Sequence, residues 1–176
     1  MNIKEPVHRR GLILGYLAAD HRRLEALLDS ATADPANIDR ALYAQFRSGL
    51  LRHIGMEERI LLPEIHRVNG GKMLAQEERL RLDHGAIAAL LVPPPLPQVI
   101  STLRRILALH DQLEEGPGGV YESCDSIVGA QAEALIARLA SAPETPVAPG
   151  VDNPNVLDAT RRALARAGYM LDDSSG

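Results

Sequence analysis

The residues most able to do chemistry are two pairs of a histidine and a glutamate, each pair four residues apart. His53 and Glu57 form the first pair, and His110 and Glu114 form the second. Residues at i and i+4 lie on the same face of a helix, one turn apart. A neutral imidazole and a carboxylate placed in this way can bind one metal ion or two adjacent ions. One such pair is a weak signal, so its meaning depends on the rest of the chain.

Helices must position these pairs, because apolar residues around them repeat every three or four positions. We expect long helices at about residues 6–33, 35–68, 72–91 and 98–115, a further helix at 120–140 and a short one at 154–167. Glycine and proline punctuate the chain between them, as at Asn69-Gly70-Gly71 and in the proline run 93–97. Each of the first four helices has a histidine at the centre of its apolar stripe: His21, His53, His84 and His110.

The composition favours an all-α fold with one sizeable core. The 176 residues are 45% hydrophobic but only 3% aromatic, so the core must be mostly aliphatic. A net charge of −4 argues against a nucleic-acid-binding surface. The single Cys124 excludes an intrachain disulfide and suits a reducing compartment. The chain has no signal-peptide pattern at its start and no apolar run of membrane-spanning length, so a cytoplasmic protein without membrane contact is expected.

The four histidines pass a test of common depth. In an up-down bundle, two residues lie at the same depth when the turn between their helices falls midway between them in sequence, because each residue rises about 1.5 Å along the axis. The midpoint between His21 and His53 is residue 37, within the expected break 34–39. The other two midpoints, for His53 with His84 and for His84 with His110, fall at the glycine turn and at the end of the proline run. The four imidazoles are therefore predicted to form one layer.

A layer that also contains two glutamates predicts a metal centre. Two unpaired carboxylates in an aliphatic core would be severely costly, and a cation offsets that cost. A single histidine on an apolar face is more often a hydrogen-bonded core residue, but four at one depth are not explained in that way. Six ligands exceed the four that a structural zinc prefers, and they suit two ions bridged by carboxylates. Mixed imidazole and carboxylate ligands favour iron, while manganese and zinc fit less well.

These residues resemble the haemerythrin-like (HHE cation-binding) domains. The resemblance rests on the four histidines, on the two glutamates and on the segments HIGMEERILLPEI and LRLDHGAI, and it covers about residues 10–120. It implies an up-down-up-down four-helix bundle that holds two non-haem iron ions. It further implies that the four imidazoles are terminal ligands and that the two carboxylates bridge the ions. The terminal ligands would be His21, His53, His84 and His110, and the bridging ones Glu57 and Glu114.

The sequence departs from oxygen-carrying haemerythrins at two positions. Those proteins have a fifth histidine four residues after the third-helix histidine, where this chain has Ala88, and an aspartate five residues after the last histidine. Glu115 has that last spacing, but Glu114 lies only about 40° around the helix from His110 and Glu115 about 140°, so we choose Glu114. The set of four histidines and two glutamates is more similar to a bacterial subgroup that includes iron–sulfur-cluster repair proteins. The Cys-containing N-terminal segment usual there is not expected here.

Other polar residues have simpler expected roles. We expect Glu58 to be solvated or paired with an arginine, because it points about 100° away from Glu57, and His66 to interact with a helix C-terminus. Tyr121 and Cys124 either line one end of the bundle or are ordinary core residues, and we favour the core. Tyr16 is placed near the centre by its spacing from His21. We expect a kink at Pro63, which has no N–H for the carbonyl of the residue four positions before it.

The prediction from sequence is a small di-iron protein that binds oxygen, nitric oxide or peroxide for sensing, iron handling or stress protection. We divide it into residues 1–141, the bundle with its following helix, and residues 142–176, a Pro-rich linker with a short C-terminal helix. That last helix packs on the bundle or on the second subunit of a homodimer. The alternatives are a di-iron enzyme and an interaction bundle whose metal is structural or lost; a binding protein is favoured over an enzyme. Any opening of the centre is expected near Gly116-Pro117-Gly118-Gly119.

Overall fold

The computed structural model describes residues 11–172, which form helices and no strand. The expected helix start near Pro6 lies outside this range. The helices are α1 Leu12–Ala31, α2 Arg40–Met56, α3 Leu62–Val68, α4 Glu77–Leu90, α5 Pro97–Glu115, α6 Val120–Val128, α7 Ala132–Ala140 and α8 Pro154–Arg166. A π-helical segment, Glu57–Leu61, joins α2 to α3, and a 3₁₀ turn, Gly129–Gln131, joins α6 to α7.

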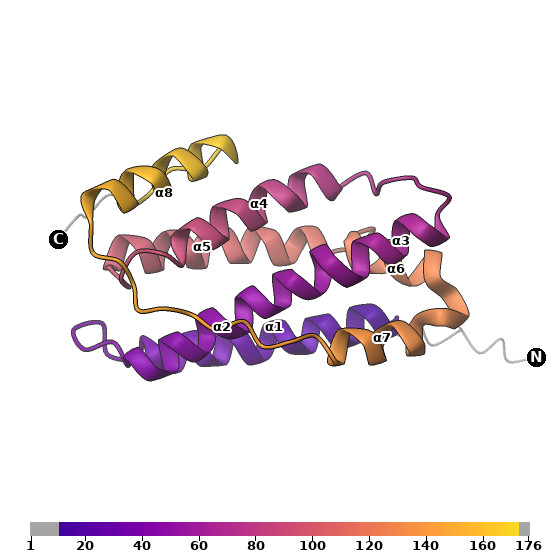
Figure 1. The fold of residues 1–176 in the computed structure, drawn as a ribbon, viewed down its shortest axis with the longest axis horizontal. Helices are drawn as coiled ribbons and strands as arrows, with labels where there is room; N and C mark the ends of the chain where they lie inside the picture. The colour runs from indigo at the N-terminus through magenta and orange to yellow at the C-terminus, as the bar shows by residue number, and fades with distance from the viewer. Residues whose placement is uncertain (1–10, 173–176) are drawn as a thin grey trace, which may run out of the picture.

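The long helices form an elongated bundle, as Figure 1 shows, in which α1, α2 with α3, α4 and α5 run along the long axis. Two apolar clusters fill it. The first cluster lies toward the turn between α1 and α2 and includes Leu24, Leu28, Phe46, Ile87 and Ile106. The second cluster lies toward α6 and includes Ile13, Leu17, Leu61, Leu80 and Val120. Along each long helix, the predicted ligands fall between residues of the first cluster and residues of the second, so a polar layer separates two dry aliphatic regions.

Two helices begin later than the apolar pattern predicts. The second helix starts at Arg40, because the Asp39 side chain accepts hydrogen bonds from the backbone N–H groups of Ala41 and Leu42 and so caps it. The helix expected at residues 72–91, α4, begins at Glu77, after a turn in which Gly70 and Gly71 have φ values of 66° and 80°. Apolar periodicity extends into both turns, whereas capping and backbone geometry set the actual ends.

The region before Pro63 is a π-helical turn. The N–H of Leu62 bonds to the carbonyl of Glu57, five residues back, and the wider turn continues into α3. Proline cannot donate a backbone hydrogen bond, and one extra residue per turn accommodates the missing donor without ending the helix. The expected irregularity is therefore present as a local π segment, and it starts at one of the predicted ligands, Glu57.

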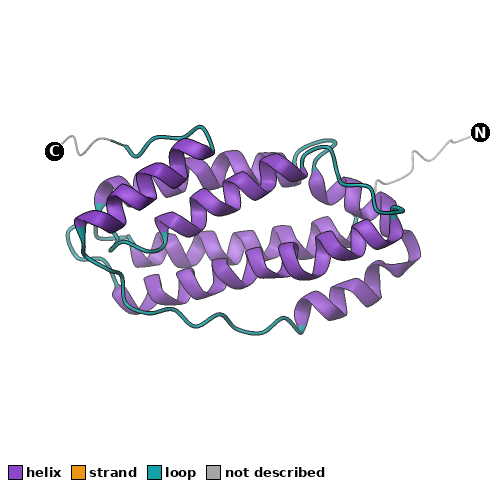
Figure 2. Ribbon diagram, turned by 45° about the horizontal axis from the view of Figure 1, so that its top comes forward, coloured by secondary structure: helices purple, strands orange, loops and turns teal. Residues whose placement is uncertain are grey.

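The segment after α5 differs from the single helix predicted at residues 120–140. Gly129, with φ of 50°, divides it into α6 and α7. The linker that follows runs over the surface as the long loop in Figure 2. Its backbone carbonyls accept hydrogen bonds from α2: Arg52 binds those of Ala140 and Ala142, and Ser48 binds that of Thr145.

The last helix, α8, packs against α4 within the same chain, where Figure 1 shows it lying above the bundle. Leu164 is fully buried and belongs to the first apolar cluster. Of the two alternatives for this helix, the structure therefore has the packing on the bundle. Among residues 11–172, no helix combines the length and the apolar character needed to span a membrane.

Candidate metal centre

Six buried side chains from four helices meet in the polar layer between the two apolar clusters. They are the six predicted residues: His21 on α1, His53 on α2, Glu57 at the start of the π segment, His84 on α4, and His110 and Glu114 on α5. His21 is 8% exposed, the other histidines are less exposed, and both glutamates have no exposed surface. The layer inferred from turn midpoints is present.

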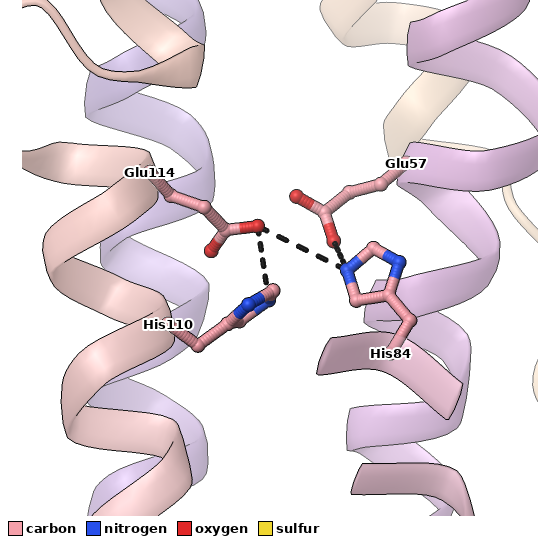
Figure 3. Close-up of side chains that lie close together, drawn as sticks. All are labelled: Glu57, His84, His110 and Glu114. Atoms are coloured by element: carbon pink, nitrogen blue, oxygen red, sulfur yellow. Dashed lines mark ion pairs between the residues drawn. The ribbon is translucent and has the colours of Figure 1, made fainter. Parts of the chain in front are cut away.

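One half of the centre contains His84 and His110, shown with the two glutamates in Figure 3. The Nε2 atom of His84 lies 3.1 Å from Oε2 of Glu57 and 4.0 Å from Oε1 of Glu114. The Nε2 atom of His110 lies 3.1 Å from the same Glu114 oxygen. One potential ligand atom from each of the four residues lies within 4.8 Å of the others, which is close enough for a single ion.

The other half contains His21 and His53, whose Nε2 atoms are 2.9 Å apart. Oε2 of Glu114 lies 3.3 Å from Nε2 of His21, and Oε2 of Glu57 lies 3.7 Å from Nε2 of His53. His21, His53 and Glu114 form a second group of potential ligands. Glu114 therefore contributes one oxygen to each half, as a bridging carboxylate would, and Glu115 does not face the centre.

Several buried atoms at the centre have no hydrogen-bond partner among residues 11–172. They are Oε2 of Glu57, both carboxylate oxygens of Glu114 and Nε2 of His84. Leaving a buried polar atom unsatisfied costs about 1–3 kcal/mol, and more for a charged group. These atoms are ligand types that bind cations and they point toward one another, so the residues present fit a bound metal.

A carboxylate on a neighbouring helix faces the outer nitrogen, Nδ1, of each histidine. His21 faces Glu115 at 2.7 Å, His53 faces Asp20 at 2.9 Å, and His84 faces Glu58 at 2.7 Å. His110 lies 3.6 Å from Asp83, beyond hydrogen-bond length. A hydrogen bond from Nδ1 to a carboxylate fixes the ring and leaves Nε2 as a lone-pair donor for a metal. All four Nε2 atoms are thus directed inward.

Each outer carboxylate also contacts an arginine. Asp20 binds Arg23, Glu115 binds Arg22, Asp83 binds Arg79, and Glu58 lies 3.6 Å from Arg81. Each is also the chain neighbour of a central residue: Asp20 precedes His21, Asp83 precedes His84, Glu58 follows Glu57, and Glu115 follows Glu114. The arginine contact predicted for Glu58 is therefore present. The hydrogen bond between Glu58 and His84 was not predicted. The sequence feature that could have indicated these outer carboxylates is an acidic residue next to a central residue on every long helix.

The model of the Hemerythrin HHE cation binding domain matches residues 12–116. The chain belongs to this family. No curated protein and no solved structure matches it. The match spans α1 to α5 and ends directly after α5, so the haemerythrin domain contains all six central residues, while α6, α7 and α8 lie beyond it.

The charges around the haemerythrin centre favour an added cation. Burial lowers the pKa of His21, but its hydrogen bond to Glu115 and the charge of Glu114 outweigh burial and raise that pKa to about 9. Burial likewise lowers the pKa of His84, and Glu57 and Glu58 raise it to about 9. Burial and the charge of Glu57 raise the pKa of Glu114. Without a metal, protons on the histidines balance the carboxylates, and a metal cation would replace those protons.

Tyr121 lies in the second apolar cluster, as favoured from the sequence, but it has a contact that the sequence did not predict. It is fully buried as expected for a core residue, but its hydroxyl enters the centre from α6. The hydroxyl donates a hydrogen bond of 2.7 Å to Oε1 of Glu57 and lies 3.3 Å from Nε2 of both His21 and His53. Cys124, one turn further along, lies in the second apolar cluster, as expected.

Three other expectations concern the surroundings of the centre. Tyr16 packs against the second apolar cluster. The Nε2 atom of His66 donates a hydrogen bond of 2.7 Å to the carboxylate of Glu77, so His66 does not meet only a helix end. A pocket of about 260 Å³ has His21 in its wall together with Leu24, Phe46 and Leu107. These residues lie on the opposite side of the layer from Gly116–Gly119, where Val120 and Tyr121 are buried.

Proposed function

We propose that this haemerythrin domain holds two non-haem iron ions and binds a small ligand such as oxygen, nitric oxide or peroxide. The observation that carries the proposal is the pair of ligand groups that share Glu114, one with His84 and His110 and the other with His21 and His53. Two adjacent groups with a common carboxylate suit two bridged ions better than one. We also propose that the helices holding these ligands form the up-down-up-down four-helix bundle of the family.

Iron fits the ligand set better than the other common metals. Four imidazoles and two carboxylates exceed a tetrahedral zinc site, and the imidazoles are unusual for magnesium or calcium, which prefer oxygen. When bound, the two irons supply redox chemistry and a coordination position for an external ligand. The protein supplies orientation through the outer carboxylates, and the two apolar clusters keep water from the centre.

The ligand must be small, because the centre is enclosed. The six central side chains have at most 8% of their surface exposed. The pocket that reaches His21 has apolar walls from residues such as Leu24, Phe46 and Leu107, and also includes the charged Glu25, Arg104 and Asp111. Sensing, iron handling and protection against oxidative or nitrosative stress are the roles we propose for such binding, in a cytoplasmic monomer or homodimer.

Metal analysis of protein purified without oxygen tests the proposal. Two iron ions per chain are expected, with a charge-transfer absorption after oxidation. Double substitution with His84→Ala and Glu57→Ala is expected to abolish binding in the half that they share. His66→Gln is the matched control, because His66 lies on α3 away from the centre and pairs with Glu77. Stoichiometric zinc in the native protein, or no metal at all, would contradict the proposal.

A further inference from the structure

We propose that Tyr121 is a seventh metal-binding residue and that its phenol oxygen binds the ion held by His21 and His53. The inference rests on the proposed function, since it requires that ion. Tyr121 lies beyond the matched family domain, which ends at residue 116, so the family match assigns it no role. Three atoms converge on one point: Nε2 of His21, Nε2 of His53 and the hydroxyl oxygen of Tyr121.

The two imidazoles and the phenol have few protons to share at this point. The Nδ1 atoms of His21 and His53 face the carboxylates of Glu115 and Asp20, and so hold the ring protons of the neutral imidazoles. Their Nε2 atoms are then both lone-pair acceptors, only 2.9 Å apart. The Tyr121 hydroxyl has one proton, which it donates to Glu57. With both ring protons on Nδ1, three lone-pair atoms face each other. A metal cation that displaces the protons of the metal-free centre would satisfy all three.

The second argument is the spacing of these atoms. An octahedral ion with bonds of about 2.1 Å places neighbouring ligand atoms about 3.0 Å apart. The hydroxyl oxygen of Tyr121 lies 3.3 Å from each Nε2, and the two Nε2 atoms are separated by 2.9 Å. These three distances describe one triangular face of such a coordination shell. Glu57, at 2.7 Å from the hydroxyl, and Glu114, at 3.3 Å from Nε2 of His21, lie at adjacent positions.

The third argument is the turn that delivers Tyr121. The backbone reverses tightly over Gly116–Gly119, and Gly118 has φ of 70°. A Cβ atom at Gly119 would lie 2.6 Å from the carbonyl oxygen of Glu114, so only glycine permits this approach. Glu114 is itself a central residue, and the close turn starts α6 beside it. Tyr121 is the second residue of α6, and it thereby reaches the centre.

The other half of the centre has no equivalent of this phenol among the described residues. His84 and His110 share Glu57 and Glu114 only. With Tyr121 bound on one side, the coordination position for a small external ligand lies on the ion held by His84 and His110. The inference thus assigns different roles to the two ions.

The test is the spectrum of the iron-loaded full chain, compared with that of the Tyr121→Phe variant. A ferric ion with a tyrosine ligand has a visible charge-transfer band and phenolate vibrations in the resonance Raman spectrum excited within it; the phenol proton leaves with the protons that metal binding releases. The native protein should show both signals and Tyr121→Phe neither. The variant should also bind one of its irons about 10–100-fold more weakly.

Tyr43→Phe is the matched control, because its hydroxyl is also buried but has no partner and lies in the first apolar cluster. It should keep both signals. Far-UV circular dichroism and thermal unfolding will show whether Tyr121→Phe retains the fold. Two irons per chain without a phenolate signal in the native protein would overturn this inference alone. No iron in the native protein would overturn the proposed function and the inference with it.

Discussion

The two halves of the centre use the same ligand types but are supported from different directions. The His21–His53 half is closed from inside the bundle by Tyr121, and both of its histidines make short hydrogen bonds to outer carboxylates. In the His84–His110 half, no phenol is present in the described part of the chain, and His110 lies 3.6 Å from its carboxylate, Asp83. Asp83 is in turn held by Arg79 and by Tyr169, which follows α8. Segments outside the matched domain therefore contribute to both halves: Tyr121 contacts one half directly, and Tyr169 supports the other through Asp83.

The largest expected effect is the loss of both ions when the shared carboxylate is removed. Glu114→Gln keeps the shape of the side chain but removes the charge that both halves share. We expect iron binding to be lost from both halves, measured as iron per chain after anaerobic loading and desalting. Glu115→Gln is the comparison, since Glu115 is the next residue but contacts Arg22 and the outer side of His21. It should weaken only the ion held by His21, by about 10–100-fold. If Glu114→Gln retains two irons, Glu114 is not a bridging ligand.

Histidine substitutions should separate the two halves. His84→Ala should lose the ion of its own half and retain the other ion with its tyrosine-to-iron band. His53→Ala should lose the ion beside Tyr121, and the band with it. The measurements are iron content and the visible spectrum of each oxidised variant. Identical spectra in the two variants would show that the ions do not bind independently, and the distinction between the halves would fail.

Proton binding should stabilise both halves of the metal-free centre. His21 and His84, one in each half, have pKa values raised from 6.5 to about 9 in the metal-free fold. The folded state then holds more protons than the unfolded state between these values. The stabilisation is complete below pH 6.5 and is lost as the pH rises through 9, by roughly 1.4 kcal/mol per pH unit for each proton released.

Urea unfolding of the metal-free protein from pH 6 to 9.5 measures this loss. Iron affinity should rise over the same range, because fewer protons compete for the imidazoles. His21→Ala and His84→Ala should each remove about one third of the pH dependence, because the pKa of His110 is also raised well above 6.5 and each variant removes one of three protons. If the free energy of unfolding of the metal-free protein increases with pH in this range, the histidines do not hold extra protons in the folded state. The centre would then have no excess of negative charge.

The six central residues were predictable because two regularities suffice to place them. Helical periodicity identified His21, His53, His84 and His110 in the apolar stripes, and the constant rise per residue brought them to one depth once the turns were located. The angle between neighbouring positions on a helix also separated Glu114 from Glu115. These are properties of single helices and their connections, so no knowledge of packing was needed.

The outer residues and Tyr121 were not predictable in this way. Glu58 lies on a different face of its helix from Glu57. Its partner, His84, can be identified only when the neighbouring helix is placed beside it. Tyr121 depends on how tightly the chain reverses at Gly119, where the carbonyl of Glu114 leaves no space for a side chain. The π segment before Pro63 similarly depends on the choice between ending a helix and widening it. Each of these is set by contacts between elements.

The smallest effect should come from Tyr169, which connects the end of the chain to the His84–His110 half. Its hydroxyl donates a hydrogen bond of 2.9 Å to Asp83, and its ring lies 4.8 Å from the guanidinium carbon of Arg79. Tyr169→Phe keeps the ring contact with Arg79 but removes the hydrogen bond, so Asp83 holds His110 less firmly. Substitution of such outer partners weakens metal binding by about 10–100-fold, and we expect the lower end because Asp83 retains Arg79.

Competition with a chelator measures the affinity of each ion, and the tyrosine-to-iron band identifies which half is affected. Tyr169→Phe should weaken the ion that does not give this band and leave the band unchanged, which is the reverse of the result expected for Tyr121→Phe. Tyr16→Phe is the control, because Tyr16 packs against the second apolar cluster. Equal weakening of both ions by Tyr169→Phe would indicate that α8 stabilises the bundle as a whole, and the separate support of the two halves would have to be abandoned.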